Sequence, residues 1–193
     1  MPSPHFLHHA FPPENFKPEE LQKIMEAFEQ VSYQKHDFLQ RAGQIAGHYF
    51  FIESGYARAY VIDPSGQEIS TNFFTQGDIL IDWQSFMLRQ PGQEQIQALT
   101  DLVTWRIDFI RFNQLFHQIQ PFREGGRSRF ANSYFALKRH QLSLITESAK
   151  DRYLGLIEEK PGLLQQVPLK YIASYLGITD TSLSRLRKEI SQD

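Results

Sequence analysis

The C-terminal stretch 179–188 is rich in polar side chains that can hydrogen-bond to nucleic acid. Arg185 can present two parallel N–H donors to O6 and N7 of guanine, and Thr181 and Ser184 are short enough to let a helix approach base edges. The remaining hydroxyl and cationic groups are better suited to phosphates, which position a protein without reading sequence. The candidate DNA-binding residues are Thr179, Asp180, Thr181, Ser182, Ser184, Arg185, Arg187 and Lys188.

Two short helices joined by a tight turn are predicted to carry these side chains. Pro168 suits the first position of one helix, and Thr179 can cap the next by accepting a hydrogen bond from a main-chain amide. Ala173 and Gly177 supply the small residue and the turn that two steeply crossing helices need. The inner faces comprise Ile172, Ala173, Leu176, Leu183, Leu186 and Ile190, which recur at helical spacing. The pattern predicts a helix-turn-helix, and the alternative is an amphipathic helical hairpin that packs on the rest of the protein and whose charged face is simply solvated.

The composition limits the classes of protein that the chain can represent. Its 193 residues suffice for a hydrophobic core and a small second domain. The net charge is −2, so affinity for DNA must arise from a local basic surface. The absence of cysteine excludes disulfides and cysteine-ligated iron–sulfur clusters. Because the sequence shows neither an 18-residue apolar run nor a signal peptide, we expect a soluble, cytoplasmic protein without a membrane partner.

Residues 1–120 have a different character and are predicted to form a β-roll. From residue 31 to about 112, short runs rich in Tyr, Phe, Ile and Val are broken by Gly and Asp, as in an all-β barrel or sandwich. The clearest hairpin turns at Asp63-Pro64-Ser65-Gly66, where proline and glycine fix the turn. A closed roll of this kind leaves room between its sheets, so we expect a small-molecule pocket there.

Residues 121–148 return to helical spacing and carry two apolar stripes. The first stripe comprises Phe130, Tyr134, Leu137, Gln141 and Leu144, and the second comprises Phe135, Leu142 and Ile145. Two stripes need two partners, so we expect one to lie on the roll of the same subunit and the other on the matching helix of a second subunit. We take the first stripe as the candidate dimer interface. The alternative is a single helix buried within one domain.

The order of β-roll, long helix and C-terminal helix-turn-helix resembles that of the Crp/Fnr family of bacterial transcription regulators. The resemblance covers nearly the whole chain, and its most specific stretches are 49–58 and 73–78 in the roll and 171–179 in the helix-turn-helix, the last similar to Bacteroidetes-type members. It implies an α+β fold. The implied parts are a cyclic-nucleotide-binding-like double-stranded β-helix, or jelly roll, over 1–120, a dimerisation helix over 121–148, and an all-α, winged-helix-like helix-turn-helix domain over 149–193.

The resemblance also implies a function and a set of partners. The expected protein is a homodimer whose recognition helices enter successive major grooves of a near-palindromic DNA site, with RNA polymerase as its partner in activation. Arg185 matches the guanine-reading arginine of the family. Asp180 and Thr181 stand where other members carry a basic and an acidic residue, so we expect a different operator sequence.

The roll departs from the cyclic-AMP site of the family. Cyclic-nucleotide-binding members hold the ribose with a glutamate after a glycine, and this pair survives only as Gly77-Asp78, where Asp78 is expected to be a turn or cap residue. The phosphate-binding arginine is missing, and Glu94 would repel a buried phosphate. We therefore expect no tight binding of cyclic AMP, and either another effector or none. The candidate effector-pocket residues are Phe73, Phe74, Gly77, Asp78, Trp83 and Arg89.

Two other classes are open from the sequence. A cupin-type metalloenzyme would share the roll but would need clustered ligands, and the histidines beyond residue 10 show no HxH or HxxxH spacing. Those at 5, 8 and 9 lie in a start that we expect to be flexible. We therefore predict no catalytic residue, metal site or cofactor. The second class is a ligand sensor or scaffold that keeps the fold without binding DNA. Little sequence follows the recognition helix, so a wing is expected only as a single strand over 163–167.

Overall fold

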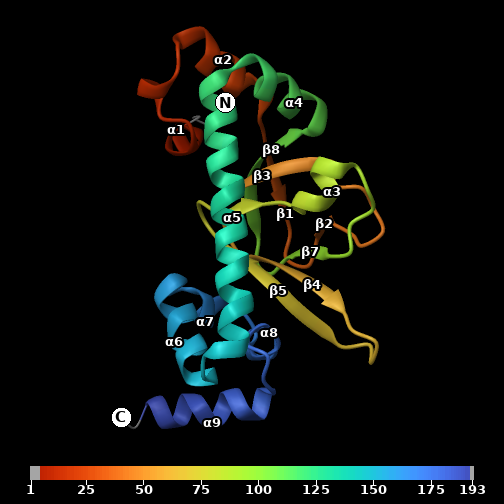
Figure 1. Cartoon of the computed structure of the whole chain (residues 1–193), viewed down its shortest axis with the longest axis vertical. Coiled ribbons are helices and arrows are strands. Elements are labelled where there is room, and N and C mark those ends of the chain that lie inside the picture. Colours follow the sequence, from red (N-terminus) through yellow and green to blue (C-terminus); the bar gives the residue numbers. More distant parts are fainter. Residues whose placement is uncertain (1–4, 192–193) are drawn as a thin grey trace.

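The computed structural model describes residues 5–191 of the chain. Helix α5 (Gln120–Thr146) runs along the long axis of the molecule, and the β-roll lies beside its middle (Figure 1). Helices α6 (Ala149–Glu159), α7 (Leu163–Gln166), α8 (Leu169–Tyr175) and α9 (Asp180–Ile190) gather at one end, where α9 lies across the foot of the molecule. The predicted order of roll, long helix and C-terminal helices is confirmed.

The roll consists of two four-stranded antiparallel sheets, as predicted for a jelly roll. Their strand orders are β1-β8-β3-β6 and β2-β7-β4-β5. The strands are β1 (Glu29–Tyr33), β2 (Phe38–Gln40), β3 (His48–Ser54), β4 (Ala57–Ile62), β5 (Glu68–Phe74), β6 (Ile79–Leu80), β7 (Gln95–Ala98) and β8 (Leu102–Asp108). The predicted hairpin joins β4 to β5, and Asp63 Oδ1 fixes its turn by accepting from the amides of Ser65 and Gln67 at 2.8 and 2.9 Å.

Two apolar cores stabilise the roll. One lies between the sheets and draws small and aromatic side chains from both, including Phe50, Ala57, Phe74 and Ile96. The other is rich in aromatic residues and joins the outer side of one sheet to α4 (Phe109–Gln118) and the start of α5. Burial of these side chains supplies the main favourable contribution to folding, because apolar surface is removed from water.

The N-terminal segment is ordered, which corrects the expectation of a flexible start. Residues His5–Ala10 form helix α1, and η1 (Pro13–Asn15) and α2 (Pro18–Ala27) follow. Leu7 and Phe11 are fully buried in the aromatic core, where the Phe11 ring stacks on that of Phe122 with centroids 5.5 Å apart. The N-terminal segment is ordered because these apolar side chains pack into the aromatic core.

The region from 31 to about 112 was predicted to be an all-β barrel or sandwich, but it also contains helical segments. Helix α3 (Trp83–Leu88) interrupts it, and the last strand ends at Asp108, where α4 begins. Both helices have aspartate caps: Asp82 accepts from the amide of Ser85, and Asp108 accepts from the amide of Arg111, each at 2.9 Å. Such caps satisfy amides that a helix start leaves unpaired, so they favour a helix over a continued strand.

The expected strand over 163–167 is a helix, and this part of the prediction was wrong. Leu163 and Val167 stand four residues apart and are both buried in the C-terminal core, and the amide of Val167 donates to the carbonyl oxygen of Leu163 at 2.9 Å, the hydrogen bond that closes a helical turn. Pro168 is the cap before α8 rather than its first helical residue. The described residues from 149 to 191 contain helices and turns but no strand, so this part has no β-wing.

Candidate nucleic-acid interface and effector cleft

Helices α8 and α9, which we call the reader, are joined by a turn centred on Gly177. Its φ of +68° lies in the left-handed region, where a side chain would be strained. The amide of Ile178 donates to the carbonyl oxygen of Ala173 at 3.0 Å and closes the end of α8. Thr179 Oγ1 accepts from the amide of Ser182 at 3.2 Å and caps α9, as predicted. Local interactions therefore hold the turn.

The inner faces of the reader pack into a common core. Ala173 and Leu183 are fully buried where the two helices meet, and Leu186 and Ile190 pack against the same cluster. Side chains of α6 and α7 complete this core, and Phe73 of the roll joins it. The reader is thus a folded helix-turn-helix packed on the roll. This packing is common to a DNA reader and to a helical hairpin whose charged face is only solvated.

The opposite face of α9 is exposed and polar. It carries Thr181, Ser184, Arg185 and Lys188. Within the described residues, no hydrogen bond or ion pair engages the side chains of Arg185 and Lys188. Two short hydroxyl side chains beside two longer cations give a helix surface that can approach base edges and phosphates together.

The other candidate DNA-binding residues lie at the edges of this face. The hydroxyls of Thr179 and Ser182 are 2.9 Å apart, so both take part in capping α9. Asp180 is exposed in the first turn, where a carboxylate is favoured by the helix dipole. Arg187 is half-buried beside the core. The structure therefore brings four of the eight predicted residues together on one exposed face.

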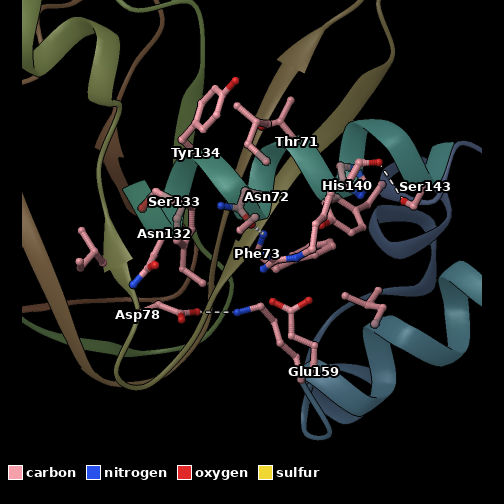
Figure 2. A pocket seen from close by; sticks show the side chains of 18 of the residues that line it. Thr71, Asn72, Phe73, Asp78, Asn132, Ser133, Tyr134, His140, Ser143 and Glu159 are labelled. Atoms are coloured by element: carbon pink, nitrogen blue, oxygen red, sulfur yellow. Dashed lines mark hydrogen bonds and ion pairs between the residues drawn. The ribbon is translucent and has the colours of Figure 1, made fainter. Parts of the chain in front are cut away.

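A cleft of about 920 Å³ lies between the roll, α5 and the C-terminal helices. Figure 2 shows side chains that surround it, among them Thr71, Asn72 and Asp78 of the roll, Tyr134 and His140 of α5, and Glu159 of α6. All three parts of the molecule contribute walls, so an occupant would contact the roll, the long helix and the C-terminal helices at once.

An ion pair bridges the cleft between the roll and the C-terminal helices. Lys160 Nζ lies 2.6 Å from Asp78 Oδ2, and the lysine side chain is only 12% exposed. The same carboxylate oxygen accepts from the amide of Thr75 at 2.9 Å. Asp78 is therefore a turn residue, as predicted, and it also ties the roll to the end of α6.

Five of the six candidate effector-pocket residues line this cleft, and one does not. The five are Phe73, Phe74, Gly77, Asp78 and Trp83. Arg89 lies outside it, at the end of α3, where Nη1 donates to the carbonyl oxygen of Ala46 at 2.7 Å. Its guanidinium covers the ring of Phe109 at 4.3 Å. These contacts hold the Arg89 side chain outside the cleft, at a residue that ends α3 in the left-handed region with φ of 55°.

The electrostatics of the cleft do not favour a phosphate beside Glu94. Burial raises the pKa of Glu94; a hydrogen bond with Thr71 opposes this shift, and the Asp82 charge adds to it, so the net direction is upward and a negative charge is disfavoured here. The cations that line the cleft are Arg129, Arg139, Arg152 and Lys160. Arg129 donates to the carbonyl oxygen of Ala10, Arg152 donates to main-chain carbonyls, and Lys160 pairs with Asp78. Three of the four cations are therefore already engaged.

Helix α5 leaves both apolar stripes largely uncovered, so it is not buried within one domain. In the first stripe Phe130, Tyr134 and Leu137 line the cleft, facing the roll, while Gln141 and Leu144 are also exposed. In the second stripe Phe135, Leu142 and Ile145 are 54%, 46% and 77% exposed. The first stripe, which we took as the dimer interface, is thus the one that faces the roll. The second stripe is more exposed and is left free for a second subunit.

Two arginines at the junction of the roll, α5 and the reader were not among the predicted site residues. Arg152 donates to the carbonyl oxygen of Glu147 at 2.6 Å and to that of Leu176 at 2.8 Å, which ties the end of α5 to the end of α8. Arg58 is fully buried in β4. Its position among Ala57, Ala59 and other apolar strand residues was a signal, because a charged residue in such a run needs a partner.

The comparisons with known proteins agree with this architecture. Residues 30–119 match the family model described as cyclic nucleotide-binding domain. FixK2 from Bradyrhizobium japonicum is similar at 16% identity over 86% of this chain and 85% of that chain, with a TM-score of 0.73. The c-di-GMP responsive global regulator CLP from Xanthomonas campestris is similar at 15% identity over 92% and 93%, with a TM-score of 0.67. No curated protein sequence matches the chain.

A third solved structure carries the family name. This chain from Eubacterium rectale, described as a transcriptional regulator of the Crp/Fnr family, is similar at 15% identity over 95% of this chain and 88% of that chain, with a TM-score of 0.73. The protein therefore contains a cyclic nucleotide-binding-type domain at 30–119. Its fold is similar to that of the structure described as a Crp/Fnr-family regulator.

Two further properties concern residues 5–191 only. This part of the chain has no group of three or more His, Asp or Glu side chains placed to hold a metal ion. None of its helices is both long and apolar enough to cross a lipid bilayer.

Proposed function

We propose that the protein is a dimeric transcription regulator of the Crp/Fnr type, in which α9 reads the major groove of DNA. The observation that carries the proposal is the outer face of α9, where Thr181, Ser184, Arg185 and Lys188 are exposed above a packed helix-turn-helix core. A helix about 10–12 Å across fits a major groove about 12 Å wide. The similar fold of CLP, a global regulator, supports the same function at low identity.

The open stripe of α5 supports the dimer. Phe135, Leu142 and Ile145 are separated by seven and three residues, the spacing at which apolar side chains meet across a two-stranded coiled coil. A second copy related by a twofold axis would cover them. Each α9 would then enter its own major groove, with half-sites about one helical turn apart. RNA polymerase is the partner that activation would require.

We further propose that the cleft binds a small effector other than cyclic AMP. A buried phosphate needs a cation, whereas the stretch 93–98 carries Glu94 and no arginine. Titration of the purified protein with cyclic AMP in a calorimeter is expected to give no saturable heat. Saturable binding of one cyclic AMP per chain would contradict this assignment.

The DNA-reading role predicts different results for two neighbouring cations. Arg185→Ala is expected to cost about 1–3 kcal/mol on the preferred site and to relax the choice of base at one position. Lys188→Ala is expected to weaken binding to all sequences alike and to reduce the salt dependence, because it removes a phosphate contact. Mobility-shift titrations on the preferred site and on a scrambled duplex, at two salt concentrations, measure both effects.

Equal losses for Arg185→Ala on the preferred and scrambled duplexes would contradict base reading by this residue. A wild-type protein that binds neither duplex would favour the sensor or scaffold without DNA binding. Metal analysis of the purified protein addresses the cupin-type enzyme, for which a stoichiometric bound metal would be required.

A further inference from the structure

We infer that the roll sets the orientation of the reader through a buried stack of Tyr60, Arg58 and Tyr171, which we call the arginine stack. Tyr60 and Arg58 belong to β4 of the roll, and Tyr171 belongs to α8 of the reader. Arg58 and Tyr171 are then positioning residues for DNA recognition, although neither reaches the recognition face of α9. The inference rests on the proposed function for its DNA readout, but its structural part can be tested without DNA.

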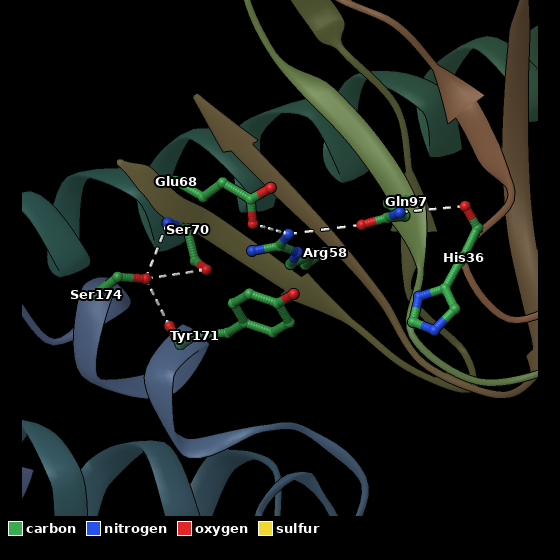
Figure 3. A network of polar contacts seen from close by, with 7 residues as sticks. All are labelled: His36, Arg58, Glu68, Ser70, Gln97, Tyr171 and Ser174. Atoms are coloured by element: carbon green, nitrogen blue, oxygen red, sulfur yellow. Dashed lines mark hydrogen bonds and ion pairs between the residues drawn. The ribbon is translucent and has the colours of Figure 1, made fainter. Parts of the chain in front are cut away.

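The contacts of Arg58 join the roll to the reader directly. The guanidinium carbon lies 4.0 Å from the centroid of the Tyr60 ring. It lies 3.4 Å from the centroid of the Tyr171 ring, which Figure 3 shows next to Arg58. Nη2 pairs with the carboxylate of Glu68 and donates to Gln97 Oε1 at 3.5 Å. A cation held by the sheet is therefore covered on one side by a ring that the reader supplies.

The polar groups of Arg58 are incompletely satisfied while α8 is docked. In the described residues, Nε and Nη1 are buried without a hydrogen-bond partner. Unpaired buried donors oppose docking, because water would satisfy them if α8 moved away. The face of the Tyr171 ring favours docking, because a cation–π contact is stronger when it is desolvated than when it is exposed to water. The docked state thus depends on that ring, which makes Tyr171 the residue to test.

Polar contacts between α8 and β5 fix the same orientation. The amide of Ser70 donates to Ser174 Oγ at 3.1 Å, and the two hydroxyl oxygens are also 3.1 Å apart. One turn of α8 therefore carries both the Tyr171 ring and the Ser174 hydroxyl to the hairpin, as Figure 3 shows. The hairpin holds the helix at two points, which prevents rotation about a single contact.

Tyr175 extends the junction to the cleft and to α5. Its ring lies 5.3 Å from the ring of Phe73 and stacks on that of His140, with centroids 4.0 Å apart and planes 6° from parallel. All three side chains line the cleft. An effector in the cleft would therefore contact the helix that the arginine stack holds, and its binding could shift the orientation of the reader.

The orientation of α8 determines that of α9 because the two helices share one core. Ala173 and Leu183 are both fully buried at their junction, so the reader moves as a unit. In a dimer, the angle and separation of the two α9 helices decide which spacing of half-sites fits. Loss of the arginine stack should therefore loosen the choice of spacing while leaving the base-reading side chains intact.

The structural part is tested by a distance measurement without DNA. The chain has no cysteine, so spin labels can be placed at Ser65→Cys in the hairpin turn and Glu189→Cys in α9, with labelled chains diluted into unlabelled protein. Wild type and Tyr171→Phe are expected to give one narrow distance distribution, because the ring is kept. Tyr171→Ala and Tyr171→Leu are expected to broaden or shift it. A narrow, unchanged distribution in both of these variants would overturn the inference.

The DNA part compares operators whose half-sites are moved apart or together by one and two base pairs. Wild type and Tyr171→Phe are expected to prefer one spacing. In Tyr171→Leu the ratio of affinities for the preferred and the altered spacings is expected to fall about tenfold. The reason is that two α9 helices without a fixed mutual geometry bind operators of several spacings equally well. A loss of affinity that is equal at all spacings would contradict the inference. If the wild type binds no DNA, the proposed function fails, and the label distances alone decide on the arginine stack.

Discussion

Leu183→Ala is expected to lower the free energy of unfolding of the reader by about 2–5 kcal/mol, because it removes a leucine side chain from a closed core. Leu183 is 0% exposed and lies where α9 meets α8, with side chains of α6 and α7 around it. The reader has no comparable second core to compensate for the cavity. Hydrogen exchange at the amides of α8 and α9 measures the effect for this part of the chain, which need not unfold together with the roll.

Leu154→Ala is the matched control for this prediction. Leu154 lies on neighbouring α6 but is 41% exposed, so its truncation is expected to change the free energy of unfolding by less than about 0.5 kcal/mol. Similar losses of exchange protection in the two variants would show that Leu183 is not at the centre of the core that supports α9.

Leu142→Glu is expected to convert the dimer to monomers and to reduce affinity for the complete operator by about 10²- to 10⁴-fold. Leu142 lies at the middle of the open stripe of α5, so a twofold axis along this helix would bring its carboxylate close to that of the second copy. Like charges in an apolar seam oppose association. The loss of affinity follows because each monomer can engage only one half-site, which removes the gain from linked binding.

Sedimentation of the purified variants measures their oligomeric state. Titration of the full operator and of a single half-site measures their affinity for DNA. Leu154→Glu is the matched control, because Leu154 is exposed to a similar degree, 41% against 46%, but lies on α6. It is expected to remain dimeric. A Leu142→Glu variant that sediments as the wild-type dimer would place the seam elsewhere on the molecule, and the cleft-facing stripe would be the first alternative.

The reader could be predicted from the sequence because its signals are local. Gly177 needs a left-handed turn, Thr179 caps the helix that follows, and Leu183 stands at the spacing of an inner face. Each of these features depends on neighbours within a few residues. The hairpin between β4 and β5 was predictable for the same reason, since its turn is stabilised by its own side chains.

The junction between the roll and the reader could not be predicted in this way. Arg58 meets Tyr171, and Lys160 meets Asp78, across stretches of chain that carry no periodic signal of their pairing. The start of the chain posed a related problem, because Phe11 is ordered by a surface made largely of later residues. Arg89 was misplaced because its charge was considered without the main-chain carbonyl of Ala46, 43 residues earlier, to which it donates.

The arginine stack and the cleft together describe how a signal in the roll would reach DNA. Phe73 and Tyr175 line the cleft, and Tyr175 and Tyr171 lie on the same short helix of the reader. An effector that favours one orientation of this helix would change the population of dimers able to bind one operator spacing. The sensor would then act on DNA recognition by positioning the reader, with the chemistry of base contacts unchanged.

Selection of binding sites from a random library of duplex DNA tests the central claim most directly. The full chain is incubated with the library, bound duplexes are recovered over several rounds, and the enriched sequences are read. Reading of the major groove by α9 in a twofold dimer predicts an inverted repeat with half-sites about one helical turn apart, in which Arg185→Ala relaxes one symmetric base position. Recovery of duplexes without a common sequence, or of a motif that Arg185→Ala leaves unchanged, would contradict it.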